Sequence, residues 1–156
     1  MHSVDIASCN DSLFDGCISV GTVNLSNHDL GLGRLRVELI GAFPDSFEDA
    51  ANVAATCAFN AFKDGMPTRP DAIHENVVSL YVRSTALPHV LLADPFLWQD
   101  GPNTLQESDL TIAWLMIVPI SDNERRFARA NGSAALTSLL EHQRVDILDL
   151  NRKSAV

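Results

Sequence analysis

The 156-residue chain is 46% hydrophobic and 20% charged, and these proportions indicate one globular domain over residues 1–156 rather than a disordered chain. Twenty acidic and 11 basic residues give a net charge of −9, which argues against nucleic-acid binding because affinity for phosphates depends on lysine and arginine. The longest apolar run, residues 112–120, has less than half of the ~20 residues that a membrane helix needs, and the first residues lack signal-peptide features. We therefore expect a cytoplasmic protein.

Alternating apolar and polar residues predict two strands early in the chain. The first covers residues 17–23 and ends before the polar loop 24–29. In the second, residues 34–39, leucine and valine alternate with arginine and glutamate. This pattern predicts a half-exposed strand with one solvent-exposed face, as antiparallel sheets allow, which Gly41 and Pro44 then end.

A helix is predicted to follow. Ser46 and Asp49 have the spacing of a capping box, with Ser46 as the N-cap, and Gly65 and Pro67 end the helix. Apolar residues at steps of three and four form one stripe that we expect to pack in the core. These residues are Ala50, Val53, Ala54, Cys57, Ala58, Ala61 and Phe62. Cys57 is one of three cysteines, whose spacing fits no zinc template.

The middle of the chain predicts three more strands. Residues 77–82 and 90–93 are short apolar runs of strand length. The segment 112–118 is apolar on both faces, which is typical of a central strand that is covered on both sides. We therefore place Trp114 in the core, and we expect Pro119 to end the pairing of this strand.

The C-terminal third predicts two helices and a last strand. Ser121 and Glu124 form a stronger capping box, and the break at residues 131–132 separates this helix from a second one that begins at Ser133. Alternation at 145–147 favours a final strand. Strands interleaved with three helices, without regular βαβ repeats, predict an α+β fold with a mostly antiparallel mixed sheet and flanking helices.

No nucleophile motif, phosphate loop or metal-binding signature occurs in the chain, so we expect a protein without a cofactor and without enzymatic activity. One alternative is a small metal-dependent hydrolase, in which His74 and His89 on paired strands would bind a metal together with a carboxylate. A second alternative is a homodimeric regulatory scaffold that pairs through an exposed sheet edge. Both alternatives stay open at this point.

The distribution of charge suggests where a partner binds. Between residues 84 and 124 there is no lysine or arginine, whereas acidic residues recur along the segment. We predict that a basic protein surface binds here, because opposite charges steer association, although acidity also serves solubility. Trp98 either anchors that partner or seals the sheet edge. The predicted partner-binding residues are Asp94, Trp98, Asp100, Glu107 and Asp109.

Two C-terminal segments resemble the Suppressor of fused domain family. The sequence WLMIVPIS at 114–121, followed by a glutamate-bearing helix, is similar to the family's strand and helix, and VDILDLNRKS at 145–154 is similar to its closing segment. Upstream, residues 36–39 and 89–92 are similar to an early strand and to the penultimate core strand. The resemblance implies an α/β sandwich.

This resemblance also carries expectations about function. Animal members bind Gli-type transcription factors with the help of a second domain, and we do not transfer that role. A stand-alone domain is similar to the bacterial members, which implies an immunity protein that neutralises a toxin of a polymorphic system. The N-terminus is short for the family, which suggests that a strand is missing or is supplied by another chain.

Overall fold

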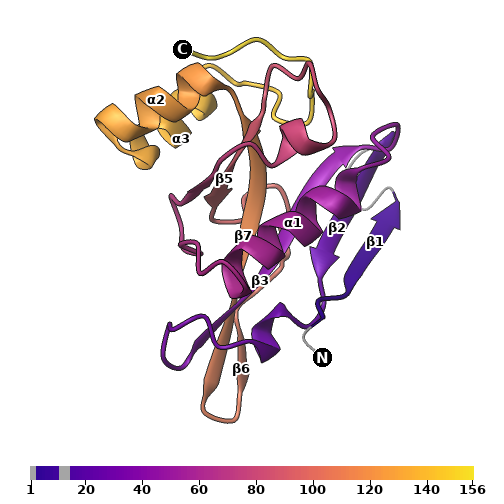
Figure 1. The fold of residues 1–156 in the computed structure, drawn as a ribbon, viewed down its shortest axis with the longest axis vertical. Helices are drawn as coiled ribbons and strands as arrows, with labels where there is room; N and C mark the ends of the chain where they lie inside the picture. Colours follow the sequence, from indigo (N-terminus) through magenta and orange to yellow (C-terminus); the bar gives the residue numbers. More distant parts are fainter. Residues whose placement is uncertain (1–2, 11–14) are drawn as a thin grey trace.

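The computed structural model describes residues 3–10 and 15–156, which form a sheet with helices on both faces (Figure 1). The sheet has seven strands in the order β1-β2-β3-β7-β5-β4, and β6 also pairs with β7. The strands are β1 (Ile6–Asn10), β2 (Cys17–Thr22), β3 (Leu35–Pro44), β4 (Ile73–His74), β5 (His89–Ala93), β6 (Leu105–Glu107) and β7 (Leu110–Ile120). The helices are α1 (Ala50–Phe62), α2 (Asp122–Asn131) and α3 (Ser133–His142), with short 3-10 helices η1 (Leu25–Asn27) and η2 (Val78–Leu80).

Strand β7 is central, as predicted. It runs parallel to β3 on one side, and it runs antiparallel to β5 and β6 on the other. The remaining pairs, β1–β2, β2–β3 and β4–β5, are antiparallel. The predicted α+β class with a mostly antiparallel mixed sheet is therefore confirmed.

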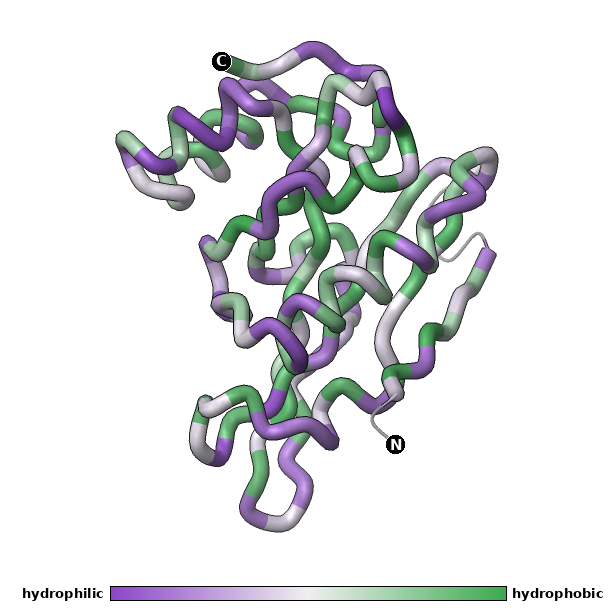
Figure 2. The backbone as a smooth tube through the Cα atoms, viewed as in Figure 1, coloured by the Kyte–Doolittle hydropathy of each residue, from purple (hydrophilic) through white to green (hydrophobic). Residues whose placement is uncertain are grey.

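Residues on β7 alternate between two hydrophobic clusters. Leu115 and Ile117 pack with the buried stripe of α1, whereas Met116 and Val118 pack with residues of α2 and α3. Figure 1 shows α1 lying across one face of the sheet, while α2 and α3 gather at one end of β7. Hydrophobic residues follow the central strands and α1, and hydrophilic ones dominate α2 (Figure 2).

The first half of the fold corrects two predictions. Helix α1 begins at Ala50 after Asp49, whose side chain makes no capping bond, so the Ser46 box does not form. Strand β3 continues through Gly41 to Pro44. Gly41 allows close packing rather than a turn, because a Cβ there would lie 2.8 Å from the ring of Phe43.

Other corrections concern short apolar runs. The predicted strand at 77–82 is η2, whose Val78 is buried and donates its N–H to the Pro88 carbonyl. The predicted strand at 145–147 has no strand structure. Pro119 does not end β7, because it still lies opposite Val90 of β5. The pairing of β7 with β3 ends before Pro119, so the proline nitrogen, which carries no hydrogen, needs no partner on that side. None of the helices in the described residues is long and apolar enough to cross a membrane.

Candidate binding surface

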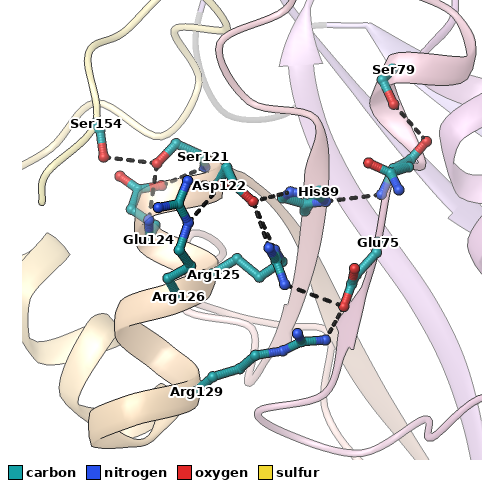
Figure 3. A network of polar contacts seen from close by, with 11 residues as sticks. Glu75, Ser79, His89, Ser121, Asp122, Glu124, Arg125, Arg126, Arg129 and Ser154 are labelled. Atoms are coloured by element: carbon teal, nitrogen blue, oxygen red, sulfur yellow. Dashed lines mark hydrogen bonds and ion pairs between the residues drawn. The ribbon is translucent and has the colours of Figure 1, made fainter.

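The junction between β7 and α2 is held by the predicted capping box. The Ser121 hydroxyl accepts the Glu124 N–H at 3.1 Å, and the Glu124 carboxylate accepts the Ser121 N–H at 2.8 Å (Figure 3). Both residues are buried. The box fixes the direction in which α2 leaves the sheet.

Glu124 also binds the C-terminal tail, residues 143–156. The Arg152 guanidinium donates to both carboxylate oxygens at 2.6 and 3.0 Å, and the Ala155 N–H donates at 2.8 Å. Burial acts to raise the pKa of Glu124, but these hydrogen bonds outweigh it and hold the pKa below its ordinary value. The carboxylate is therefore charged and fully paired inside the protein.

A more exposed network joins α2 to β4 and β5 (Figure 3). Asp122 accepts hydrogen bonds from Arg125, at 2.7 Å, and from Arg126, and these lower its pKa. Glu75 forms ion pairs with Arg125 and with Arg129. These contacts pair the acidic side chains with the arginines and connect α2 to the region of β4 and β5. The network is therefore structural rather than a charged surface free to bind a partner.

The two histidines proposed as metal ligands have other partners. His74 lies opposite Val90 on β5, so the two strands pair as predicted, but the side chains of His74 and His89 point to opposite faces of the sheet. The Nε2 of His74 lies 3.0 Å from the Pro67 carbonyl, whereas His89 accepts the Asn76 N–H at Nδ1 and contacts Asp122 through Nε2. No group of three histidine, cysteine or acidic side chains within residues 3–10 and 15–156 could hold a metal.

One face of the sheet is hollowed where α2 and α3 do not reach. A groove of about 510 Å³ lies over β2, β3, β6 and the start of β7, and we call it the open-face groove. Trp114 lines it and is half-buried, so the prediction that Trp114 lies in the core is wrong. Its indole extends across β3, and its Cζ3 lies 3.9 Å from the position of a Cβ on Gly21. The wall also includes Ile40, Leu105 and Ile112.

Glu38 closes one side of this groove and is buried, which corrects the prediction of a solvent-exposed face on its strand. Its carboxylate accepts hydrogen bonds from the Thr22 hydroxyl and from the N–H groups of Leu25 and Ser26, the latter two at 3.2 and 2.9 Å. Glu38 thus supplies acceptors for the otherwise unpaired N–H groups at the start of η1. The Glu38 carboxylate therefore serves the fold rather than a partner.

The predicted partner-binding acids fall into separate places. Glu107 lines the open-face groove, and Asp109 lies at the turn between β6 and β7, where both are exposed. Asp94 and Asp100 are exposed on the loop that follows β5. Ala93 pairs with Met116, so at about 3.3 Å per residue Asp94 lies roughly 20 Å from the hairpin turn.

Trp98 is half-buried and packs against the hydrophobic cluster on the α2 and α3 side. This contact favours the interpretation that Trp98 seals the sheet. Its role as a partner anchor stays a prediction, as does binding by the four acids.

The sequence profile of the family described as Suppressor of fused protein (SUFU) matches residues 1–153. The chain belongs to the Suppressor of fused family. It is 36% identical over 158 aligned positions to "Immunity protein YqcF" of Bacillus subtilis (strain 168), covering 99% of this chain and 82% of that protein. The resemblance stated from the two C-terminal segments is therefore confirmed.

Solved structures agree on the fold. A SUFU homologue from Neisseria gonorrhoeae FA 1090 superposes with a TM-score of 0.63 at 17% identity, covering 98% of this chain and 88% of that one. Drosophila Suppressor of Fused gives a TM-score of 0.69 at 14% identity, covering 96% of this chain and 42% of that one. These identities show a shared fold alone.

The structure explains why the two signature segments of this Suppressor of fused domain occur together. Residues 114–121 and 145–154 meet at the capping box, where Arg152 binds Glu124 and the Ser154 hydroxyl lies 2.7 Å from that of Ser121. A pattern could have revealed this contact: an arginine that follows the apolar residues of the tail and a glutamate after an apolar strand are charged residues that need partners. Sequence reasoning treated Glu124 as a cap alone.

Proposed function

We propose that this Suppressor of fused domain is a cytoplasmic immunity protein, which neutralises a toxin of a polymorphic system by covering a basic surface of it. Its 36% identity to the Bacillus subtilis immunity protein YqcF carries this proposal. Grooves and exposed acidic side chains among the described residues supply surface for a basic partner.

The acidic segment supplies the attraction for the toxin. Asp94, Asp100, Glu107 and Asp109 are exposed, so their charges act through solvent on an approaching basic surface. Such charges mainly raise the association rate. Trp98 adds apolar surface beside them.

The direct test looks for a toxin gene beside the gene for this chain and expresses the encoded toxin domain with and without the chain. We expect co-expression to restore growth and the two purified proteins to form a stable complex. Continued toxicity without complex formation contradicts the proposal. A catalytically inactive toxin is used in the binding assay, so that the toxin can be purified without killing the host cells.

The contribution of the acids is tested by reversing the charge of Asp100, Glu107 and Asp109 together. We expect slower association and a weaker dependence of its rate on salt, because electrostatic steering is lost. The control is Asp64→Lys, an exposed acid just beyond α1. Unchanged association kinetics in the triple variant would exclude this surface.

The homodimeric scaffold keeps one supporting observation. Strand β1 is an edge of the sheet, and four of its five residues are exposed, so its outer side offers backbone groups to a second strand. Light scattering over a hundredfold concentration range tests this alternative. A constant monomer mass excludes it.

A further inference from the structure

A second groove lies on the same face of the sheet as the open-face groove. It has a volume of about 590 Å³ and forms where residues 145–149 of the tail pass the start of β2, so we call it the tail groove. Cys17 lines the tail groove, and Ser19 and Gly21 line the open-face groove. Alternate residues of a strand share one face, so the two grooves follow each other along β2.

The tail groove offers apolar contact surface. Phe96 is 46% exposed, which is unusual for a large aromatic side chain, and it forms one wall together with Leu97. Val145 and Ile147 also line the groove and are half-buried. A partner's side chain placed against these residues would bury apolar surface.

The charges that line the groove are of one sign. Asp15, Asp146 and Asp149 line it, and none of the described lining residues is lysine or arginine. Arg144 precedes Val145 and lines a neighbouring cavity of about 80 Å³, which shares Phe96, Val145 and Ile147 with the tail groove. The pKa of the Cys17 thiol is raised, first by burial and then by Asp146 and Asp45, as expected where negative charge gathers.

We propose that the tail groove receives a segment of the toxin in which an aromatic or aliphatic side chain is flanked by lysine or arginine. The apolar walls select the anchoring side chain, and the aspartates select its basic neighbours. This inference rests on the proposed immunity function. Of the segment 94–109, only Phe96 and Leu97 belong to the tail groove, and the rest of the main contact lies outside that segment.

The three free cysteines provide a footprint of the complex. Cys17 lines the tail groove, Cys9 lines the open-face groove, and Cys57 is fully buried. The unmodified chain is alkylated with N-ethylmaleimide, alone and bound to an inactive form of the toxin domain used in the co-expression test, and each cysteine is quantified by mass spectrometry. We expect binding to slow the modification of Cys17 at least about tenfold, with Cys57 unreactive in both states.

The outcomes separate the two proposals. If a complex forms and Cys17 reacts at its free rate, the tail groove is not the contact and the immunity function stands. If Cys9 alone is protected, the open-face groove is the contact instead. If no complex forms, the immunity function fails and this inference fails with it.

Matched variants give a second measurement. The Asp146 and Asp149 side chains accept the N–H groups of Leu148 and Asn151, and asparagine keeps that acceptor while removing the charge. We expect D146N/D149N to slow association about five- to tenfold at low salt. D64N, which removes an exposed charge beyond α1, is the control. Association as fast as in the D64N variant would overturn the inference.

Phe96 is tested in the same way. We expect Phe96→Ala to weaken toxin binding at least about tenfold, because the partner's anchoring side chain would lose its aromatic contact. A melting curve shows whether the variant folds, and the asparagine pair decides the question if it does not. Binding equal to that of the unmodified chain would overturn the assignment of Phe96 as the wall for the anchor.

Discussion

The two ends of β7 differ although they belong to one strand. Its last residues, 116–120, are buried, with Ile117 on the α1 side and Met116, Val118 and Ile120 on the side of α2 and α3, and the charged groups nearby are paired within the fold. Its first residues, 110–114, are half-buried and have no helix over them on the face that carries Trp114. The covered end is held by buried packing and paired charges, and the open end leaves apolar and acidic side chains along a groove.

The largest expected effect is a loss of stability at the covered end. Arg152→Ala leaves the buried Glu124 carboxylate without its partner, so we expect a loss of about 3–5 kcal/mol in the free energy of unfolding. Denaturant unfolding measures it. The control is Arg83→Ala, an exposed residue for which we expect a change within about 0.5 kcal/mol. Equal losses would contradict a special role for the tail.

Truncations along β7 sharpen the same contrast. Met116→Ala removes a fully buried side chain and should cost about 2–5 kcal/mol. Ile112→Ala, in the open-face groove, should cost about 1 kcal/mol or less, because little buried surface is lost. Thermal and denaturant unfolding of both variants test this. Similar losses for the two would mean that the open end also carries the core.

The covered end should also respond to acid. Burial lowers the pKa of His74 and of His89, so the unfolded chain binds protons first as the pH falls. Their contribution to stability is complete above about pH 6.5 and is lost as the pH falls below it. We therefore expect a lower free energy of unfolding at pH 5.5 than at pH 7.5, and a smaller difference in His74→Gln. Stability that rises on acidification contradicts this.

The smallest effect lies in the tail groove. Removing one of the charges that raise the pKa of Cys17, by Asp146→Asn, should bring that pKa closer to its ordinary value. More thiolate is then present at pH 8, so alkylation should accelerate by less than about tenfold. Cys9 in the same sample is the internal control. An unchanged rate would mean that Asp146 does not act on the groove.

The elements that the sequence predicted correctly were each indicated by more than one sequence feature. The strand 112–118 and the helix after Ser121 each combined a hydrophobic pattern with a capping or breaking residue, and both formed. The stripe on α1 was long enough to identify its buried face. Helix α1 nevertheless began later than Ser46 indicated, because a capping pattern does not guarantee that the side chain bonds.

The failures have physical causes. Residues 77–82 bury valines from a 3-10 turn, and a short apolar run does not distinguish that arrangement from a strand. The neighbours of Trp114 in the sequence are apolar, as in a core strand, but the exposure of Trp114 depends on where α2 and α3 end. Strands β1 and β6 were missed because their exposed residues show little hydrophobic pattern. The tail groove joins segments far apart in sequence, which no local pattern shows.

The parallel pairing of β3 with β7 has a consequence for how the chain folds. Leu35 pairs with Thr111 and Gly41 with Ile117, so nearly half of the chain lies between the partners. Loop closure over such a distance slows folding. During synthesis, the β2–β3 pair and α1 can form early, but β3 keeps an unpaired edge until β7 leaves the ribosome. We therefore expect nascent chains that end before β7 to be prone to aggregation.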